Sequence, residues 1–424
     1  MESKTRRHWI RGTGLLLMGL AAIAAWVLWP RTAPPVDERL LKPRMPSGST
    51  NGNAVFLLER ATALFCSTNE LNQIVRNRND DAPPDRESAQ RLLDAEAEAL
   101  GLIREAFRQP QCELTRAPEW TTNDLVVPNW GALARLASLE AELWAADGAS
   151  APAWNRAGDL VALGHRLEDS GGDWFTYLAA CSTKRTGLRL MRRLAARGEV
   201  SADQLQRRIL QLESFPSNGA GLTNAVAWMF RHGILDLSNT ITMAGVAFPV
   251  PGGSTLALSP PRLLYDPNRT RRRMAQQHLD LLAALATPGE ETIDDADSRG
   301  ARTSPFLLLI QGNAVGTILA DMAASSGQSL FRTARRENNE VAATRLLLAL
   351  RAYQEAEGHL PEALERLVPT YLDRLPRDAF DGEPLRYSRE RRCIWSVGPN
   401  RVDDGGIARN AAKEILDDVF ELGW

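Results

Sequence analysis

The sequence predicts a mainly α-helical protein with one membrane-spanning segment near the N-terminus and a small antiparallel sheet near the C-terminus. The 424 residues are 44% hydrophobic and 24% charged, and are rich in alanine, leucine and arginine, which lose little rotamer freedom in helices. One long uncharged run follows the basic N-terminus, and short alternating runs occur near the C-terminus. The formal net charge of -2 gives no general attraction to nucleic acid, so we expect no nucleic-acid partner.

Residues 1–30 are expected to form a basic cytoplasmic flank and a transmembrane signal-anchor. Residues 12–29 carry no charge, and about 20 apolar residues cross a bilayer. The basic residues before this run keep the N-terminus in the cytoplasm. We therefore expect a single-pass protein of the inner (cytoplasmic) membrane, with most of the chain on the periplasmic side. A signal peptide cleaved near residues 21–25 is the alternative.

Residues 31–53 are rich in Pro, Ser and Gly and lack hydrophobic periodicity, which predicts a flexible tether. Residues 54–304 are expected to form a domain of helical hairpins, because apolar residues recur at helical spacing. The expected helices cover residues 53–65, 88–108, 131–144, 151–169, 174–196, 201–212, 222–241 and 266–286. Ser201 and Asp266 are expected N-caps. Gly and Pro break the helical pattern at residues 244–261.

The helices expected at 131–144 and 151–169 carry small residues where two helices could approach closely. These residues are Ala134, Ala137, Ala141, Gly158 and Gly164. The pair resembles a tetratricopeptide-like hairpin, although no repeat with a period of about 34 residues is present. We therefore expect a stack of helical hairpins.

Residues 305–340 are expected to be connecting helices. The apolar run 305–327 is interrupted by Gln311, Asn313 and Asp321, which favours a buried helix over a second membrane span. A long amphipathic helix is expected to follow at residues 331–355.

The four cysteines form no C-x-x-C pair, so the sequence indicates neither a zinc site nor a thioredoxin-like motif. Cys66 and Cys112 are the candidates for a disulfide in an oxidising compartment. Isolated buried thiols are the alternative. The sequence also contains no nucleophile elbow, phosphate-binding loop, dinucleotide-binding loop or H-E-x-x-H motif, and we therefore expect a protein that is not an enzyme.

Residues 341–424 are expected to form a small α+β module. After the long helix come a Gly-x-x-Pro turn at residues 358–361, a short helix at 364–368 and a Pro-rich segment at 375–384. Alternation at 385–388 and 393–397 predicts a β-hairpin.

This order of motifs resembles the C-terminal module of type II secretion pseudopilins, of the major pseudopilin type. The resemblance implies that residues 415–420 form the closing segment of the sheet. The segment 375–384 resembles their Pro-x-Asp-Pro-Trp-Gly-x-Pro sequence. The whole layout is similar to that of a family of uncharacterised membrane-anchored bacterial proteins. The resemblance implies an architecture and no particular activity.

In the major pseudopilins a Ser-x-Gly-Pro-Asp loop and a later Asp-Asp pair hold a calcium ion. Here residues 396–400 match the loop, with Asn400 in place of Asp. The resemblance therefore implies a calcium site that includes Asn400, Asp417 and Asp418. Asp403 and Asp404 are additional carboxylates inside the loop, and we expect them to contribute as well, since calcium takes oxygen ligands. A hydrogen-bonded turn without an ion is the alternative, and no other cofactor is expected.

The sequence thus favours a membrane-anchored, extracytoplasmic binding or scaffold protein with an envelope protein as partner. One alternative is an accessory component of a type II secretion or pilus-like assembly. Another is an enzyme whose site is built from dispersed carboxylates, which a deep cleft lined by carboxylates with perturbed pKa values would favour.

Overall fold

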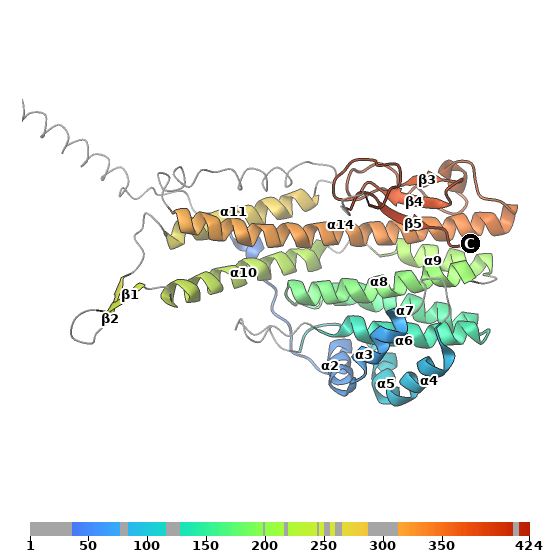
Figure 1. Cartoon of the computed structure of the whole chain (residues 1–424), viewed down its shortest axis with the longest axis horizontal. Coiled ribbons are helices and arrows are strands. Elements are labelled where there is room, and N and C mark those ends of the chain that lie inside the picture. Colours follow the sequence, from blue (N-terminus) through green and yellow to red (C-terminus); the bar gives the residue numbers. More distant parts are fainter. Residues whose placement is uncertain are drawn as a thin grey trace, which may run out of the picture.

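Helices account for 65% of the computed structural model, which also contains a small three-stranded antiparallel sheet (Figure 1). The structure describes residues 36–76, 84–115, 128–197, 200–215, 219–243, 246–249, 255–258, 265–286, 313–409 and 415–424. The membrane segment and signal-anchor expected at residues 1–30 lie outside these ranges. Within them, no helix has both the length and the apolar character that a membrane crossing requires.

The N-terminal helices form a small cap at one edge of the molecule. They are α2 (Ala54–Leu64), α3 (Thr68–Arg76), α4 (Arg86–Ala95) and α5 (Ala97–Ala106). The single helix expected at 88–108 is divided at Glu96, whose carboxylate accepts hydrogen bonds from the N–H groups of Cys66 and Ser67, at 3.2 and 3.0 Å. Those N–H groups lie just before α3, so Glu96 caps a helix that was not predicted between residues 65 and 88.

The central helices stack in layers next to this cap (Figure 1). They are α6 (Trp130–Ala146), α7 (Ser150–Glu168), α8 (Trp174–Arg197) and α9 (Ala202–Glu213). Their positions confirm the helices expected from the sequence. Ser201 caps α9 by accepting a hydrogen bond from the N–H of Gln204 at 3.3 Å, as predicted.

Two glycines set the close approach of α7 and α8. A Cβ atom on Gly164 would overlap the backbone of Lys184, and one on Gly187 would lie 2.8 Å from the carbonyl oxygen of Ala157. The expectation that small residues allow close helix packing is therefore confirmed at Gly164.

Helices α10 (Gly219–Met243) and α11 (Pro267–Ala286) extend away from the central layers, and a hairpin of β1 (Val246–Pro249) and β2 (Thr255–Leu258) lies between them in the sequence. The helix break expected here is confirmed, whereas the hairpin was not predicted. Asp266 caps α11 as predicted, because its carboxylate accepts from the N–H groups of Asn268 and Arg269 at 2.9 and 3.1 Å.

Residues 36–53 are packed against the helices, which differs from the flexible tether expected there. Leu41, in the short 3-10 helix η1 (Arg39–Leu41), is 3% exposed. The N–H of Arg44 donates to Asn224 in α10 at 2.6 Å. Asn53 caps α2 and also donates to the carbonyl oxygen of Glu113 at 2.7 Å.

Helix α14 (Ala314–Glu357) runs for 44 residues along the whole molecule (Figure 1). The sequence predicted two helices here, separated near Gly327. The helix continues because its first half packs on α10 and α11 and its second half on α8 and α9, and this packing outweighs the low helix propensity of glycine.

The C-terminal module contains η2 (Leu364–Leu367) and the strands β3 (Arg386–Ser388), β4 (Cys393–Ser396) and β5 (Asp418–Glu421). The strand order is β3-β4-β5, and Ile394 pairs with both Tyr387 and Phe420. The sheet lies on the side of α14 opposite α8 and α9 (Figure 1). This confirms the short helix, the hairpin and the closing strand predicted for residues 341–424.

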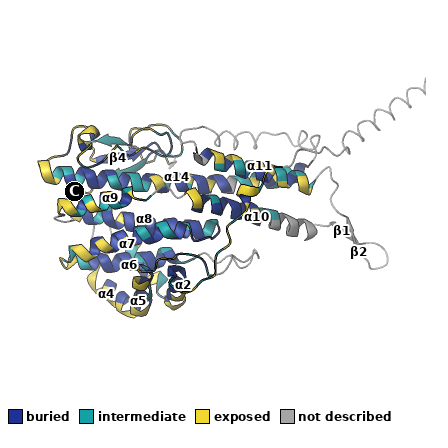
Figure 2. Cartoon of the chain, turned by 180° about the vertical axis from the view of Figure 1, so that it is seen from behind, coloured by how far each residue is buried: buried dark blue, intermediate teal, exposed yellow. Residues whose placement is uncertain are grey.

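The buried residues, dark blue in Figure 2, form two clusters, and α14 belongs to both. The larger joins α2–α9, the second half of α14 and the C-terminal module. The smaller joins η1, α8, α10, α11 and the first half of α14. The module expected at residues 341–424 therefore contributes to the same buried cluster as the central helices.

The disulfide candidate Cys66 with Cys112 is wrong for this fold, in which both thiols are free. Cys66 follows the C-terminal end of α2, whereas the neighbour of Cys112, Gln111, accepts a hydrogen bond from the first residue of α2. A helix of 11 residues is about 16 Å long, and a disulfide requires Cα atoms within about 7 Å.

Candidate functional site

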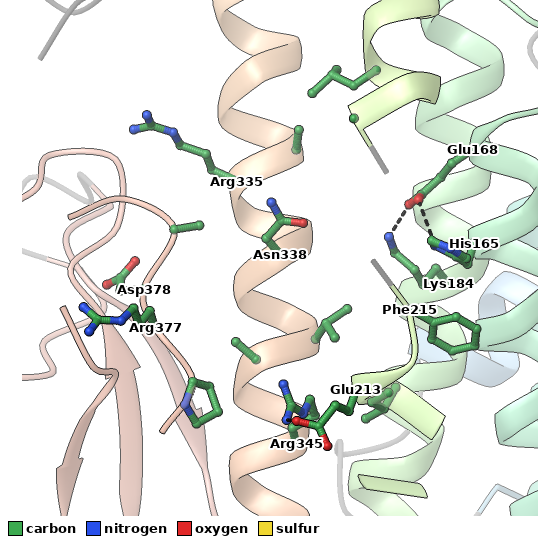
Figure 3. A pocket seen from close by; sticks show the side chains of 18 of the residues that line it. His165, Glu168, Lys184, Glu213, Phe215, Arg335, Asn338, Arg345, Arg377 and Asp378 are labelled. Carbon is green, nitrogen blue, oxygen red and sulfur yellow. Dashed lines mark hydrogen bonds and ion pairs between the residues drawn. The ribbon is translucent and has the colours of Figure 1, made fainter. Parts of the chain in front are cut away.

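A cavity of about 830 Å³ lies between α14, parts of α7–α11 and the loop at residues 374–382 (Figure 3). Nothing in the sequence predicts this cavity, because its walls come from segments far apart in the chain. Figure 3 shows Arg377 and Asp378 on one side of α14, and His165, Glu168 and Lys184 on the other.

One face of α14 forms the long wall of the cavity. The residues on this face are Phe331, Ala334, Arg335, Asn338, Val341, Ala342 and Arg345. Their spacing of three and four residues places them in one stripe, which is about 21 Å long at 1.5 Å per residue. Apolar and polar side chains alternate in groups along it.

The inner wall contains a buried ion pair between α7 and α8. The Lys184 ammonium contacts the Glu168 carboxylate, and His165 Nδ1 lies 3.6 Å from Glu168 Oε2. Burial alone would raise the pKa of Glu168, but the contacts with His165 and Lys184 outweigh it and lower this pKa. Burial likewise opposes the charge of Lys184, but Glu168 raises the pKa of that ammonium. The pair is therefore held in its charged form.

The opposite wall is the loop at 374–382, which Asp378 holds in place. The side chain of Asp378 is fully buried. Its carboxylate accepts hydrogen bonds from Asn339 Nδ2 on α14 at 2.9 Å, Ser396 Oγ on β4 at 3.0 Å, and the N–H groups of Phe380 and Val397. Each donor satisfies part of a carboxylate that would be costly to bury alone. Asp378 therefore joins helix, loop and sheet.

Basic residues exceed acidic residues in the cavity lining. The basic residues are Lys184, Arg335, Arg345, Arg374 and Arg377, and the acidic residues are Glu168, Glu213 and Asp378. Each carboxylate already has a cationic neighbour: Glu168 has Lys184, Glu213 lies 2.5 Å from Arg345, and Asp378 lies 3.3 Å from Arg386. The lining therefore carries an excess of positive charge.

Buried ion pairs connect α14 to α8 at residues of α14 that are next in sequence to the cavity-lining residues. Arg185 contacts Glu337, and Arg192 lies 2.8 Å from Glu340. The side chain of Glu337 is only 1% exposed, and burial raises its pKa to about 7, although Arg185 and Lys184 oppose this shift. Glu337 thus titrates near neutral pH within the contact between the two helices.

The residues predicted to bind calcium lie around the loop at 398–406 and β5, but they point in different directions. Asp417 is 1% exposed, and its carboxylate accepts from the N–H groups of Asp404 and Gly406 at 3.3 and 2.6 Å. Burial, together with the charges of Asp403 and Asp404, raises the pKa of Asp417, although the two N–H groups oppose this. Asp417 therefore closes the loop through hydrogen bonds.

The other predicted ligands contact neighbouring side chains. Trp395 Nε1 donates to Asp403 at 2.9 Å, and this hydrogen bond lowers the pKa of Asp403. Asn400 Nδ2 donates to Asp404 at 2.8 Å. Asp418, the first residue of β5, lies 3.2 Å from Arg336 of α14. The structure thus brings four of the residues to one loop and turns Asp418 away.

In the described ranges, no group of three or more His, Cys, Asp or Glu residues is arranged to hold a metal ion. The cavity residues of α14 gave one signal in the sequence, a long amphipathic helix with several arginines. Their partners on α8, α9 and the 374–382 loop gave none.

Comparisons with protein families, with curated proteins and with solved structures find no match for this chain.

Proposed function

We propose that this chain is a membrane-anchored, extracytoplasmic binding protein without enzymatic activity, and that the cavity along α14 is its ligand site. The observation that carries the proposal is the cavity itself. Its volume of about 830 Å³ falls within the ~300–1,000 Å³ of ligand sites in proteins. Its lining combines apolar side chains with a few charged groups, as such sites do.

The location rests on the basic residues and the uncharged run at residues 1–30. This pattern favours a single-pass signal-anchor in the inner membrane, with residues 36–424 on the periplasmic side. The packing of residues 36–53 against α10 supports a short connection between the anchor and the folded part.

The stacked hairpins α6–α9 support a tetratricopeptide-like scaffold as the frame of the site. Helices α7 and α8 approach closely at Gly164, and both contribute to the inner wall of the cavity. The frame holds the wall residues in fixed positions, which lowers the cost of ordering them when a ligand binds.

A bulky residue in the cavity tests this proposal. Asn338 lines the cavity and is exposed, so Asn338→Trp narrows the cavity without disturbing the core. Glu365→Trp, on the exposed surface of η2, is the matched control. The full-length chain, crosslinked in the bacterial envelope and purified in detergent, should retain a partner as wild type and as Glu365→Trp, and lose it as Asn338→Trp. Equal recovery with all three chains, or no partner with any, would contradict the proposal.

A second candidate function is an accessory role in a type II secretion or pilus-like assembly. It is favoured by the pseudopilin-like sequence of the C-terminal module, whose long helix leads into a three-stranded antiparallel sheet. Deletion of the gene should then reduce secretion of type II substrates. Unchanged secretion in the deletion strain would contradict this role.

Calcium at the 398–406 loop stays a prediction. The ligand oxygens would come from Asn400, Asp403, Asp404 and Asp417, with Asp418 taking no part because it is paired with Arg336. The charges of Asp403 and Asp404 raise the pKa of Asp417, and a divalent cation would relieve this repulsion.

A further inference from the structure

The cavity contains three polar groups that the folded chain leaves available to a ligand. Arg374 and Arg377 are exposed at the loop that forms one wall, and neither has an acidic partner in the part of the chain that the structure describes. Arg377 donates to the carbonyl oxygen of Gly382 at 2.7 Å, which leaves its charge uncompensated. The amide of Asn338, on α14, makes no hydrogen bond with the described residues.

The hydrogen-bonding capacity and charge of these groups favour a ligand that carries carboxylates and also contains peptide groups. A guanidinium group presents several N–H donors in a planar fork that matches a carboxylate. An Asn amide both donates and accepts, which suits a peptide group. The carboxylates of the lining are already paired, so the excess positive charge remains to attract an acidic ligand.

The order of side chains along α14 distinguishes a peptide from a lipid. Phe331 and Ala334 are followed by Arg335 and Asn338, then by Val341 and Ala342, and finally by Arg345. A hydrocarbon tail lying along this stripe would desolvate polar side chains without offering them hydrogen bonds. An extended peptide alternates polar and apolar groups itself, and the stripe of about 21 Å corresponds to roughly six residues at ~3.4 Å each.

We propose that the cavity binds an extended acidic peptide of about six residues, with its carboxylates on Arg374 and Arg377 and one of its peptide groups on Asn338. The proposal rests on the proposed function and specifies the ligand class of the same site. The peptide lies along α14, and its apolar side chains contact Val341 and Phe331.

Fluorescence anisotropy with defined peptides tests this proposal on the full-length chain in detergent. The probe is a fluorescein-labelled peptide of sequence Asp-Leu-Asp-Leu-Asp-Leu, and the charge control is Lys-Leu-Lys-Leu-Lys-Leu. The double variant Arg374→Ala with Arg377→Ala removes the two guanidinium groups. Arg366→Ala with Arg389→Ala removes two exposed arginines outside the cavity and is the matched control.

The acidic probe should bind wild type and the control variant with a Kd below about 100 μM, and the cavity variant at least about tenfold more weakly. The basic peptide should not bind. Equal affinity for the two double variants, or no binding of the acidic probe up to about 1 mM, would overturn the proposal. Binding of palmitate in place of the acidic peptide would also overturn it and assign the cavity to fatty carboxylates. In that case Asn338→Trp would still abolish binding of palmitate. The cavity would then remain a ligand site, as the proposed function states, but its ligand would not be a peptide.

Discussion

The side chain of Asn339 binds Asp378 and the residue after it at the same time. Its Nδ2 donates to Asp378 Oδ1 at 2.9 Å, and its Oδ1 accepts from the N–H of Ala379 at 2.7 Å. Both bonds join α14 to the loop that forms one wall of the cavity. Asn339 thus fixes the distance between the helix and the loop that carries Arg374 and Arg377.

Replacement of Asn339 by alanine should therefore lower the free energy of unfolding by about 1–3 kcal/mol, because a buried hydrogen-bonded amide is lost and its partners are left incompletely satisfied. Asn338→Ala is the matched control, since Asn338 is the neighbouring residue but is exposed and forms no hydrogen bond in the described structure. Urea unfolding, monitored by circular dichroism, measures the free energy of unfolding of both variants. Equal effects of the two substitutions would show that the contact with Asp378 contributes little.

The buried carboxylate of Glu337 should make the free energy of unfolding depend on pH. Burial raises its pKa from 4.5 to about 7, so the folded chain binds this proton more tightly than the unfolded chain. The resulting stabilisation is present below about pH 4.5 and is lost as the pH rises through 7. Its full size is on the order of 3 kcal/mol.

Glu337→Gln should therefore reduce the difference in unfolding free energy between pH 5 and pH 8. Glu362→Gln, whose side chain is 88% exposed, should keep the wild-type difference. Urea unfolding at the two pH values gives the comparison. If Glu337→Gln retains the wild-type difference, then Glu337 is not the group that titrates.

Two glycine-to-alanine substitutions should have opposite effects on stability, because Gly164 lies in the contact between α7 and α8 and Gly101 does not. Gly164→Ala should destabilise the chain by about 1–3 kcal/mol, because the new Cβ overlaps the backbone of α8 and the helices must separate. Gly101 lies in α5 with open space around its Cα, so Gly101→Ala should stabilise by about 0.5–1 kcal/mol. Thermal unfolding of both variants tests the pair. Destabilisation by Gly101→Ala, or none by Gly164→Ala, would contradict the packing described.

If the 398–406 loop takes up calcium, the ion at 100 times its Kd should add ~2.7 kcal/mol to the free energy of unfolding, and the unfolding temperature should be higher with calcium than with a chelator. The structure adds a discriminating control. Asp418→Asn should keep the calcium effect, because Asp418 contacts Arg336, whereas Asp417→Asn should lose it. No shift in wild type would favour the turn without an ion, and loss of the shift in Asp418→Asn would contradict the arrangement of the loop.

Local signals in the sequence were sufficient to place most helices and the first two strands of the C-terminal sheet, whereas the third strand was expected only from the resemblance to pseudopilins. Ser201 and Asp266 cap the helices that they were expected to cap, because capping depends on residues only two or three positions away. Alternation over a few residues likewise predicted β3 and β4. The continuity of α14 through Gly327 was not predictable in this way, because it depends on α10 and α11, which pack on it.

The cavity was not predictable because its geometry depends on pairs of residues far apart in the sequence. Arg185 and Glu337 are separated by 152 positions, and Asn339 and Asp378 by 39. A charged residue on an amphipathic helix is usually solvent-exposed, so nothing in the sequence distinguished Glu337 from its neighbours. The predicted calcium residues were found near one another because they lie within one short loop and the strand beside it.

Site-specific photo-crosslinking tests the binding role of the cavity most directly. A photoreactive amino acid at Ala379, which lines the cavity, should form an adduct with an envelope component in living cells. The same amino acid at Ala363, an exposed alanine outside the cavity, should form none. Adducts from both positions in equal amount, or from neither, would contradict the account.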